Sequence, residues 1–293
     1  MPELPEVETV RTGLQILLPG QRITAMHCDW PKSFLGTPQD VKQFLIGASV
    51  EAVRRRAKVL IIDLATGYSL VIHLKMTGQL VFRKKGANFG AGHPNQSLIG
   101  ELPDKSTRII FDFADGAKLF FNDQRKFGWV RLLPTAEVIN LDFFKKVGPE
   151  PLAADFSAED FAARLQRRSK SGIKAVLLDQ TVIAGVGNIY ADESLWGAKI
   201  HPDTKVQDIR PAKIKALYQS LRQVLQLSIE KGGSTDRNYV DAEGKRGSYL
   251  AFAKVFRREG QPCPRCGTTI IKTRVAGRGT HLCPKCQVRC YHT

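Results

Sequence analysis

Four of the six cysteines form two closely spaced pairs near the end of the chain. Two residues separate Cys263 from Cys266, two separate Cys283 from Cys286, and residues 267–282 lie between the pairs. A spacing of two residues lets one tight turn offer both thiolates to the same tetrahedral ion. The pattern predicts a zinc ribbon that holds one structural Zn²⁺, in a module too small to fold without the metal.

Between the cysteine pairs, residues 268–281 alternate as expected for a β-hairpin with Ala276-Gly277-Arg278-Gly279 at its tip. Glycines on both sides of Arg278 allow the backbone to approach a ligand closely. The alternative is an ordinary exposed arginine in a turn. Cys28 and Cys290 fall outside the metal pattern.

The first residues also carry potential chemistry. Once Met1 is removed, Pro2 would present a secondary amine, and the pKa of a peptide α-amino group, about 8, lies well below that of lysine. Such an amine is appreciably neutral at pH 7 and can attack an electrophilic carbon. Pro2 and Pro5 also suit the first turn of a helix, so these residues alone leave both interpretations open.

The composition favours a polyanionic partner. Lys and Arg number 44 against 28 Asp and Glu in 293 residues, a formal charge of +16. Nucleic acid is the first candidate, an acidic membrane surface the second, and a basic protein without either partner the third. No apolar run approaches the ~20 residues of a membrane span, and the acidic N-terminus lacks a signal region. We therefore expect a soluble intracellular protein.

The N-terminal part of the chain reads as one helix followed by strands. Apolar residues at helical spacing predict a helix over residues 4–18, which Pro19-Gly20 ends. Apolar runs around turn signals then predict hairpins. The predicted strand pairs are 59–64 with 70–74 and 109–113 with 118–121. One helix followed by antiparallel strands indicates a β-sandwich or barrel through about residue 134.

Beyond a predicted linker, marked by Pro134 and by Gly148-Pro149-Glu150-Pro151, the pattern becomes helical. Ser157 and Asp160 form a capping-box start. The predicted helices are 157–168, 173–180, 188–198 and one from Pro211 to Gly232-Gly233, and residues 232–249 are predicted to form a mobile loop.

Several motifs, in the same order along nearly the whole chain, resemble those of the bacterial formamidopyrimidine-DNA glycosylase family, which includes the endonuclease VIII branch. They are Pro2–Thr9 (PELPEVET), Arg55–Lys58, His73–Gly78, Arg125–Gly128, Ala184–Glu193 and the ribbon with Gly277-Arg278-Gly279. The PELPEVET start favours the formamidopyrimidine branch.

The resemblance implies an α+β fold: an N-terminal β-sandwich with a leading helix, and a C-terminal helix–two-turns–helix domain carrying the zinc-ribbon β-hairpin. The expected division is 1–134 for the catalytic sandwich, 135–151 for the linker, 152–231 for the helical domain, 232–249 for a lesion-recognition loop and 250–293 for the ribbon. It also implies a cytoplasmic bacterial monomer that binds double-stranded DNA, with no membrane partner.

The catalytic roles are likewise implied by the resemblance. Pro2 would attack C1′ of the damaged nucleotide and form an iminium, and Glu3 would protonate the sugar ring oxygen. Glu6 would support the site, Lys58 would touch a phosphate and assist elimination, and Arg278 would grip the phosphate beside the lesion. For the two glutamates, complementing the charge at a helix terminus is the alternative role.

An extruded base leaves a gap in the duplex that the protein must fill. Met76, Arg125 and Phe127 match the family's insertion triad, although Met76 and Phe127 could equally be core residues. Lys174 and Asn188 match phosphate contacts. The chain departs from the family pattern at two expected DNA contacts, with Ser106 at a position that is often histidine and Lys126 at one that is usually arginine.

The resemblance therefore implies a bifunctional glycosylase and AP lyase. Its substrates would be 8-oxoguanine and formamidopyrimidines opposite cytosine, and β,δ-elimination would cut the strand. An endonuclease VIII-like enzyme for oxidised pyrimidines is the first alternative, and a non-catalytic ribbon protein that binds nucleic acid is the second. The Gly-rich residues 86–103 have no assigned role.

Overall fold

The computed structural model describes residues 2–93, 95–234 and 249–289. Most of the predicted loop at 232–249, and Cys290, therefore lie outside the described residues. The chain divides into two compact units. The first comprises the residues up to 145 with those from 231 to 248, and the second comprises 146–230 with the residues from 249 onward.

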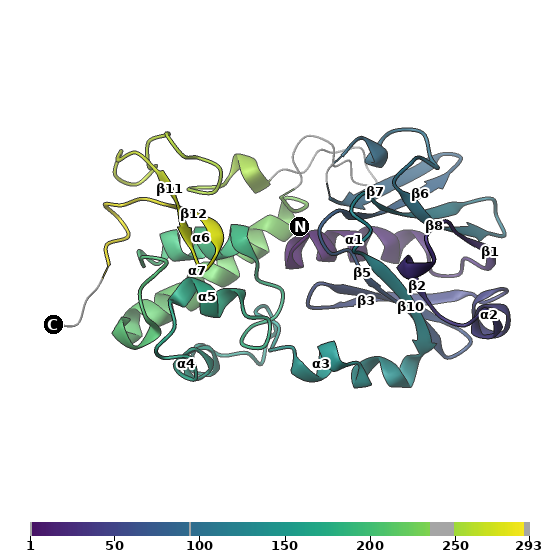
Figure 1. Ribbon diagram of the computed structural model, residues 1–293, viewed down its shortest axis with the longest axis horizontal. Coiled ribbons are helices and arrows are strands. Elements are labelled where there is room, and N and C mark those ends of the chain that lie inside the picture. Colours follow the sequence, from purple (N-terminus) through teal and green to yellow (C-terminus); the bar gives the residue numbers. More distant parts are fainter. Residues whose placement is uncertain (1, 94, 235–248, 290–293) are drawn as a thin grey trace. The chain divides into compact units, whose positions relative to one another are not determined.

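The first unit opens with helix α1 (Leu4–Leu17), close to the predicted bounds (Figure 1). Val7, Val10 and Leu14 are buried, as their helical spacing predicts. Glu3 is the N-cap, and its carboxylate accepts the Glu6 N–H while the Glu6 carboxylate accepts the Glu3 N–H. This reciprocal capping box satisfies two backbone donors that a helix start otherwise leaves unpaired.

Two five-stranded sheets form a β-sandwich, which confirms the predicted architecture of this unit (Figure 1). One sheet has the order β1-β8-β9-β6-β7 and the other β2-β10-β5-β4-β3. Both predicted hairpins are present, as β4 with β5 and β8 with β9. The strands are β1 (Ile23–Cys28), β2 (Phe34–Leu35), β3 (Val50–Arg56), β4 (Val59–Leu64), β5 (Tyr68–His73), β6 (Gly78–Lys84), β7 (Ala87–Gly92), β8 (Thr107–Phe113), β9 (Lys118–Asp123) and β10 (Trp129–Pro134).

Alternating residues from both sheets, together with the apolar face of α1, form the core of this unit. α1 packs against β3 and β7, and an added Cβ at Gly13 would lie 2.1 Å from a ring carbon of Phe89. Helix and sheet therefore approach closely at Gly13. The unit also contains short helical segments: η1 (Pro31–Ser33), α2 (Pro38–Asp40), η2 (Val41–Leu45), η3 (Gln96–Leu98), η4 (Thr135–Asn140) and α3 (Asp142–Lys146). The last of these, α3, ends at the boundary between the two units.

The second unit is helical and carries a two-stranded hairpin, so the α+β class is confirmed (Figure 1). Its apolar residues form a separate core around Phe161, Tyr190 and Leu217. The predicted capping box of Ser157 and Asp160 is present. The elements are α4 (Ala158–Gln166), α5 (Ile173–Leu178), α6 (Asn188–Gly197), η5 (Val206–Asp208), α7 (Pro211–Glu230), η6 (Tyr249–Ala251), β11 (Ile271–Val275) and β12 (Arg278–Leu282).

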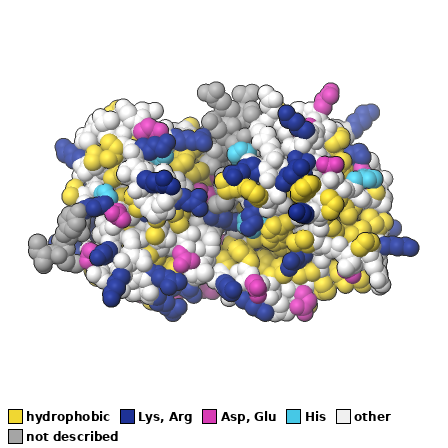
Figure 2. All heavy atoms as spheres, in the orientation of Figure 1, with side chains coloured by type: hydrophobic (Ala, Val, Ile, Leu, Met, Phe, Trp, Pro, Cys, Tyr) yellow, Lys and Arg dark blue, Asp and Glu magenta, His cyan; other side chains and the backbone are white. Residues whose placement is uncertain are grey.

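The surface carries the basic excess of the sequence. On the face shown in Figure 2, Lys and Arg side chains are spread over both units, and acidic side chains are fewer. Among the described residues, no helix combines the length and apolar character that crossing a bilayer requires.

Candidate active site and nucleic-acid interface

Pro2 lies directly before α1, next to a buried glutamate. Pro2 is itself buried, and Glu3 and Glu6 are 3% and 5% exposed. The Glu3 N–H donates to Glu6 Oε2 at 2.8 Å, so the backbone directly after Pro2 is held by the capping box. The positive end of a helix favours negative charge on these two carboxylates. The structure thus brings together three of the predicted catalytic residues.

Glu6 also binds a distant segment of the same unit. Its Oε1 accepts the Ser234 N–H at 2.7 Å. Gly233 has φ +85°, and a Cβ there would lie 3.3 Å from Glu6 Cγ, so glycine permits both the backbone conformation and the close approach. Glu6 therefore connects the chain start to the beginning of the predicted loop at 232–249.

Lys58 lies in the tight turn between β3 and β4. Arg56 pairs with Val59, which leaves Ala57 and Lys58 as the turn residues, and Ala57 has φ +54°. Arg55 donates to Glu8 Oε2 at 2.7 Å and to the Ala57 carbonyl at 2.8 Å. Because Glu8 belongs to α1, this ion pair ties the Lys58 turn to the helix that begins after Pro2.

His73, at the end of β5, was not selected as a site residue from the sequence. Burial, and then the positive charges of Lys75 and Lys58, lower its pKa to about 3. Its Nδ1 accepts the Lys75 N–H at 3.0 Å, so the ring is neutral with the proton on Nε2. The sequence could have marked His73 as a site residue only through its place in the motif at 73–78. Its charge state depends on burial and on residues that the fold brings close to it.

A second group of predicted residues lies in the turn after β9. Arg125 and Phe127 are exposed, and the Arg125 guanidinium lies 4.9 Å from the centre of the Phe127 ring. Phe127 is 53% exposed, which excludes the core-packing alternative for this ring. Met76 is partly exposed in the neighbouring turn between β5 and β6.

Asp123 and Thr77 hold this turn in place. Thr77 Oγ1 accepts the Arg125 N–H at 3.0 Å and donates to Asp123 Oδ1. The other Asp123 oxygen accepts the Gly128 N–H at 2.6 Å. Asp123 is fully buried, so the backbone that carries the exposed Arg125 and Phe127 side chains is anchored to a buried residue. Sequence reasoning did not identify either supporting residue, because the two positions are brought together only by the pairing of β6 with β9.

Ser106 lies buried in the turn that precedes β8. It is 3% exposed, and its hydroxyl donates to Asp104 Oδ1 at 2.6 Å. Its backbone N–H donates to the same oxygen at 2.7 Å. Ser106 thus closes a turn with Asp104, and its contact with DNA stays a prediction.

In the second unit, Asn188 is the first residue of α6 and lies beside the hairpin tip. Its Nδ2 donates to the Gly279 carbonyl at 2.9 Å, and among the described residues its buried Oδ1 accepts no hydrogen bond. Gln180 supports the preceding turn, because it donates to the Val186 carbonyl at 2.8 Å and accepts the Gly185 N–H at 3.0 Å. The N–H groups of a helix start point out along the helix axis, and here they lie next to the tip that carries Arg278, a geometry that suits an anion.

Arg278 is exposed, as expected for a ligand contact. It is the first residue of β12 and pairs with Val275, so that Ala276 and Gly277 form the turn, with φ +50° and +71°. The tip of the hairpin is thus a tight two-residue turn that presents Arg278.

Lys174 is buried among polar partners of the second unit. Its side chain has no exposed surface, and its Nζ lies 2.6 Å from Asp192 Oδ1, 2.7 Å from Thr280 Oγ1 and 3.2 Å from the Gly279 carbonyl. An ammonium has three N–H donors, and these three acceptors use all of them. The side chain of Lys174 ties α5 and α6 to β12, and its contact with a phosphate stays a prediction.

The four predicted metal ligands converge. The cysteine sulfurs lie within 4.8 Å of one another, with Cys263–Cys286 at 4.0 Å and Cys266–Cys283 at 3.5 Å. Four thiolates at about 2.3 Å from a tetrahedral zinc would be separated by about 3.8 Å. The donor set and its spacing fit one structural Zn²⁺ with no open coordination position.

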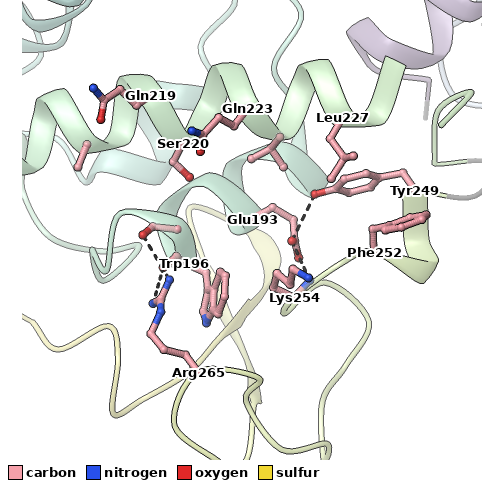
Figure 3. Close-up of a pocket in the computed structure, with 13 residues that line it drawn as sticks. Glu193, Trp196, Gln219, Ser220, Gln223, Leu227, Tyr249, Phe252, Lys254 and Arg265 are labelled. Carbon is pink, nitrogen blue, oxygen red and sulfur yellow. Dashed lines mark hydrogen bonds between the residues drawn. The ribbon is translucent and has the colours of Figure 1, made fainter. Parts of the chain in front are cut away.

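Helix α6 anchors the ribbon (Figure 3). The Arg265 guanidinium lies 3.8 Å from the centre of the Trp196 ring and donates to the Trp196 carbonyl at 3.0 Å. The Trp196 indole N–H points to Cys263 Sγ at 3.4 Å. The Glu193 carboxylate accepts three successive backbone N–H groups, from Lys254, Val255 and Phe256, and burial raises its pKa.

The predicted residues thus form two groups, one in each unit. Pro2, Glu3 and Glu6 lie at the start of α1, the Lys58 turn is tied to the same helix through Arg55 and Glu8, and the exposed turn at 125–127 belongs to the same unit. Asn188 and Arg278 lie together in the second unit. The fold and site therefore define a class of protein: a basic protein of two units, a β-sandwich and a helical domain, in which the helical domain carries a zinc ribbon.

Comparison with known families identifies the class further. Residues 1–130 match the formamidopyrimidine-DNA glycosylase N-terminal domain, 147–239 its H2TH domain, and 260–288 the zinc finger found in FPG and IleRS. A formamidopyrimidine-DNA glycosylase from Pelotomaculum thermopropionicum is 43% identical over 98% of this chain and 99% of that protein. One from Chloroflexus aurantiacus is 44% identical over 98% of each chain. The chain belongs to the formamidopyrimidine-DNA glycosylase family.

Solved structures agree with the fold. A Lactococcus lactis FPG variant in complex with DNA containing Fapy-dG has a TM-score of 0.86 and 37% identity, and the match covers 98% of this chain and 100% of that chain. MutM in complex with DNA containing carbocyclic 8-oxo-G has a TM-score of 0.84 and 36% identity over the same shares. The L. lactis enzyme bound to DNA with an abasic site has a TM-score of 0.85 and 36% identity, again over the same shares.

Proposed function

We propose that this protein is a bifunctional DNA glycosylase and AP lyase that removes oxidised purines, 8-oxoguanine and formamidopyrimidines, in base excision repair. One observation carries the chemistry: Pro2 is buried directly before a capped helix, with Glu3 and Glu6 at the start of that helix. The ion pair between Arg55 and Glu8 ties the Lys58 turn to the same helix. The relatives that bind Fapy-dG, 8-oxo-G and abasic DNA support this choice of substrate.

The reaction begins at the amine of Pro2. Once Met1 is removed, the neutral nitrogen attacks C1′, the bond from C1′ to the base breaks, and the departing base takes up the proton that the nitrogen loses. Glu3 protonates the ring oxygen as the sugar opens to an iminium. Loss of a C2′ proton expels the 3′ phosphate, and a second elimination expels the 5′ phosphate. Water then releases the sugar fragment and restores the amine. Lys58 assists elimination, and Arg278 holds the phosphate beside the lesion.

The duplex is held by both groups of residues. Phe127 and Met76 fill the space left by the extruded base, and Arg125 faces the orphaned cytosine. The N-terminal amides of α6, Asn188 and Arg278 grip a phosphate, which fixes register without reading sequence. The zinc supplies no chemistry to the reaction and keeps the Arg278 hairpin folded when bound. We also propose that the enzyme acts as a monomer in the cytoplasm, at the nucleoid.

Borohydride trapping tests the proposal. Sodium borohydride should reduce the iminium and leave a covalent adduct of enzyme and 8-oxoguanine duplex, and Pro2→Gly should lose most of this adduct. Glu3→Gln should lower base excision more than cutting of a preformed abasic site, because an abasic site can react as its open-chain aldehyde, which has no ring oxygen to protonate. A Pro2→Gly protein that traps as well as the parent would refute the nucleophile.

Substrate choice is tested separately. The parent should excise 8-oxoguanine opposite cytosine faster than thymine glycol. The reverse order would identify an endonuclease VIII-like enzyme, and salt-sensitive binding without any cleavage would identify a non-catalytic ribbon protein.

A further inference from the structure

A cation–π contact connects the insertion turn to a different segment of the sandwich. The Lys126 ammonium lies 4.0 Å from the centre of the Trp30 ring, well inside the range of such contacts. Lys126 is the middle residue of the exposed turn that presents Arg125 and Phe127. Trp30 lies in the connection between β1 and β2, far away in sequence.

Trp30 itself is firmly placed. Its carbonyl accepts the Ser33 N–H at 2.8 Å and the Cys28 thiol at 3.3 Å. The strand that follows, β2, pairs with β10 through Phe34 and Val130. Because β10 begins directly after the insertion turn, the ring and the turn are anchored to the same strand.

The centre of the turn needs a partner of this kind. Asp123 holds its two ends through the N–H groups of Arg125 and Gly128. Lys126, between them, has φ +59°, a conformation that non-glycine residues rarely adopt and that surrounding contacts must stabilise. The Trp30 ring provides such a contact from outside the turn.

We propose that Trp30 is a positioning residue for the insertion turn: by holding the Lys126 ammonium, it fixes the turn in the conformation that directs Arg125 and Phe127 toward the opposite strand. The inference rests on the proposed function and assigns a role to a residue outside the catalytic and DNA-contacting groups. Preordering the two side chains lowers the entropy lost when they enter the duplex. The lysine at this usually arginine position retains its function because a cation of either kind binds an aromatic face.

The test compares Trp30→Leu, Lys126→Met and their double variant. Each is assayed under single-turnover conditions on an 8-oxoguanine:cytosine duplex and on a single-stranded oligonucleotide with one abasic site, which has no opposite strand to fill. We expect each single variant to lower the ratio of duplex rate to single-strand rate by about two- to fivefold. The double variant should be no worse than either one, because both remove the same contact.

Two further variants separate positioning from simple loss of charge. Lys126→Arg should keep the parent's ratio, since a guanidinium also stacks on indole. Lys32→Met is the matched control, because its ammonium lies over the same ring at 5.9 Å and its exposed side chain is outside the turn. We expect Lys32→Met to keep the parent's ratio.

The outcomes are distinguishable. Additive losses in the double variant, or a Trp30→Leu protein with the parent's ratio, would overturn the positioning role while leaving the proposed function intact. A parent protein that gives no borohydride adduct on either substrate would instead remove the proposed function. Cutting of the single-stranded substrate reports that each variant is folded.

Discussion

The β-sandwich and the zinc ribbon each carry one of the two groups of predicted site residues, and they are stabilised in different ways. The sandwich has a large apolar core in which Phe82, Phe89 and Phe121 are almost completely buried. The described part of the ribbon buries few apolar side chains beside its cysteines, chiefly those of Val255, Ile270 and Leu282. Apolar burial therefore stabilises the region around Pro2, whereas the hairpin of Arg278 depends on metal ligands and buried polar contacts.

Because the two regions are stabilised differently, different mutations should destabilise each of them. A packed apolar core is sensitive to volume and to buried charge, because its side chains have little room to rearrange. A small module held by one ion is sensitive to that ion and to the few polar contacts that attach it. Four changes test this contrast, beginning with the one of largest expected effect.

Removal of the metal should unfold the ribbon and leave the sandwich intact. Zinc binding by such modules contributes about 10–16 kcal/mol at pH 7, far more than the small ribbon core supplies. Cys283→Ser, at a fully buried ligand, should release zinc and abolish duplex cleavage. A zinc-release assay and circular dichroism measure the two effects, with Cys28→Ser as the control. Retained cleavage without bound zinc would show that the ribbon core folds unaided.

Lys174→Met should be the most damaging change among the polar contacts of the second unit. It leaves the Asp192 carboxylate buried without its cation, which costs about 3–5 kcal/mol. Urea unfolding measures this loss. Lys174→Met combined with Asp192→Asn should recover part of it, because the remaining charge is removed. A single variant as stable as the parent would mean that the hairpin is not held by this pair.

Gly13→Ala should destabilise the sandwich by about 3 kcal/mol through overpacking. In an open helix the same change stabilises by about 1 kcal/mol, so the sign is diagnostic. The added Cβ would meet the Phe89 ring at 2.1 Å. Thermal unfolding provides the measurement, and Ile16→Ala, at a residue 72% exposed on the same helix, is the control. A gain in stability would show that α1 moves away from β7 at little cost.

The free energy of unfolding should fall at acidic pH because of the low pKa of His73 in the folded protein. Its folded pKa of about 3 lies below the unfolded value near 6.5, so between these values only the unfolded chain binds the proton. The stabilising contribution is complete above about pH 6.5 and is lost as pH falls toward 3. At pH 5 the loss is about 2 kcal/mol. Urea unfolding at pH 8 and pH 5 should show a smaller difference for His73→Gln than for the parent, whereas His27→Gln, at an exposed histidine, should match the parent.

Local patterns in the sequence determined much of the fold. The bounds of α1, two hairpins of the sandwich, the capping box at Ser157 and the four metal ligands all follow from spacings within short segments. Helical period, turn residues and ligand spacing are local properties, so one sequence is enough to predict them. The motif order also indicated the family, which the domain matches confirm.

Only the tertiary structure decided what the remaining polar residues do. Lys174 and Ser106 are buried with Asp192 and Asp104 as partners, although their positions predicted phosphate contacts. The low pKa of His73 likewise depends on which cations surround it. A charged side chain binds whichever group the fold brings within a few ångströms, and strand pairing and packing set that neighbour across long stretches of chain.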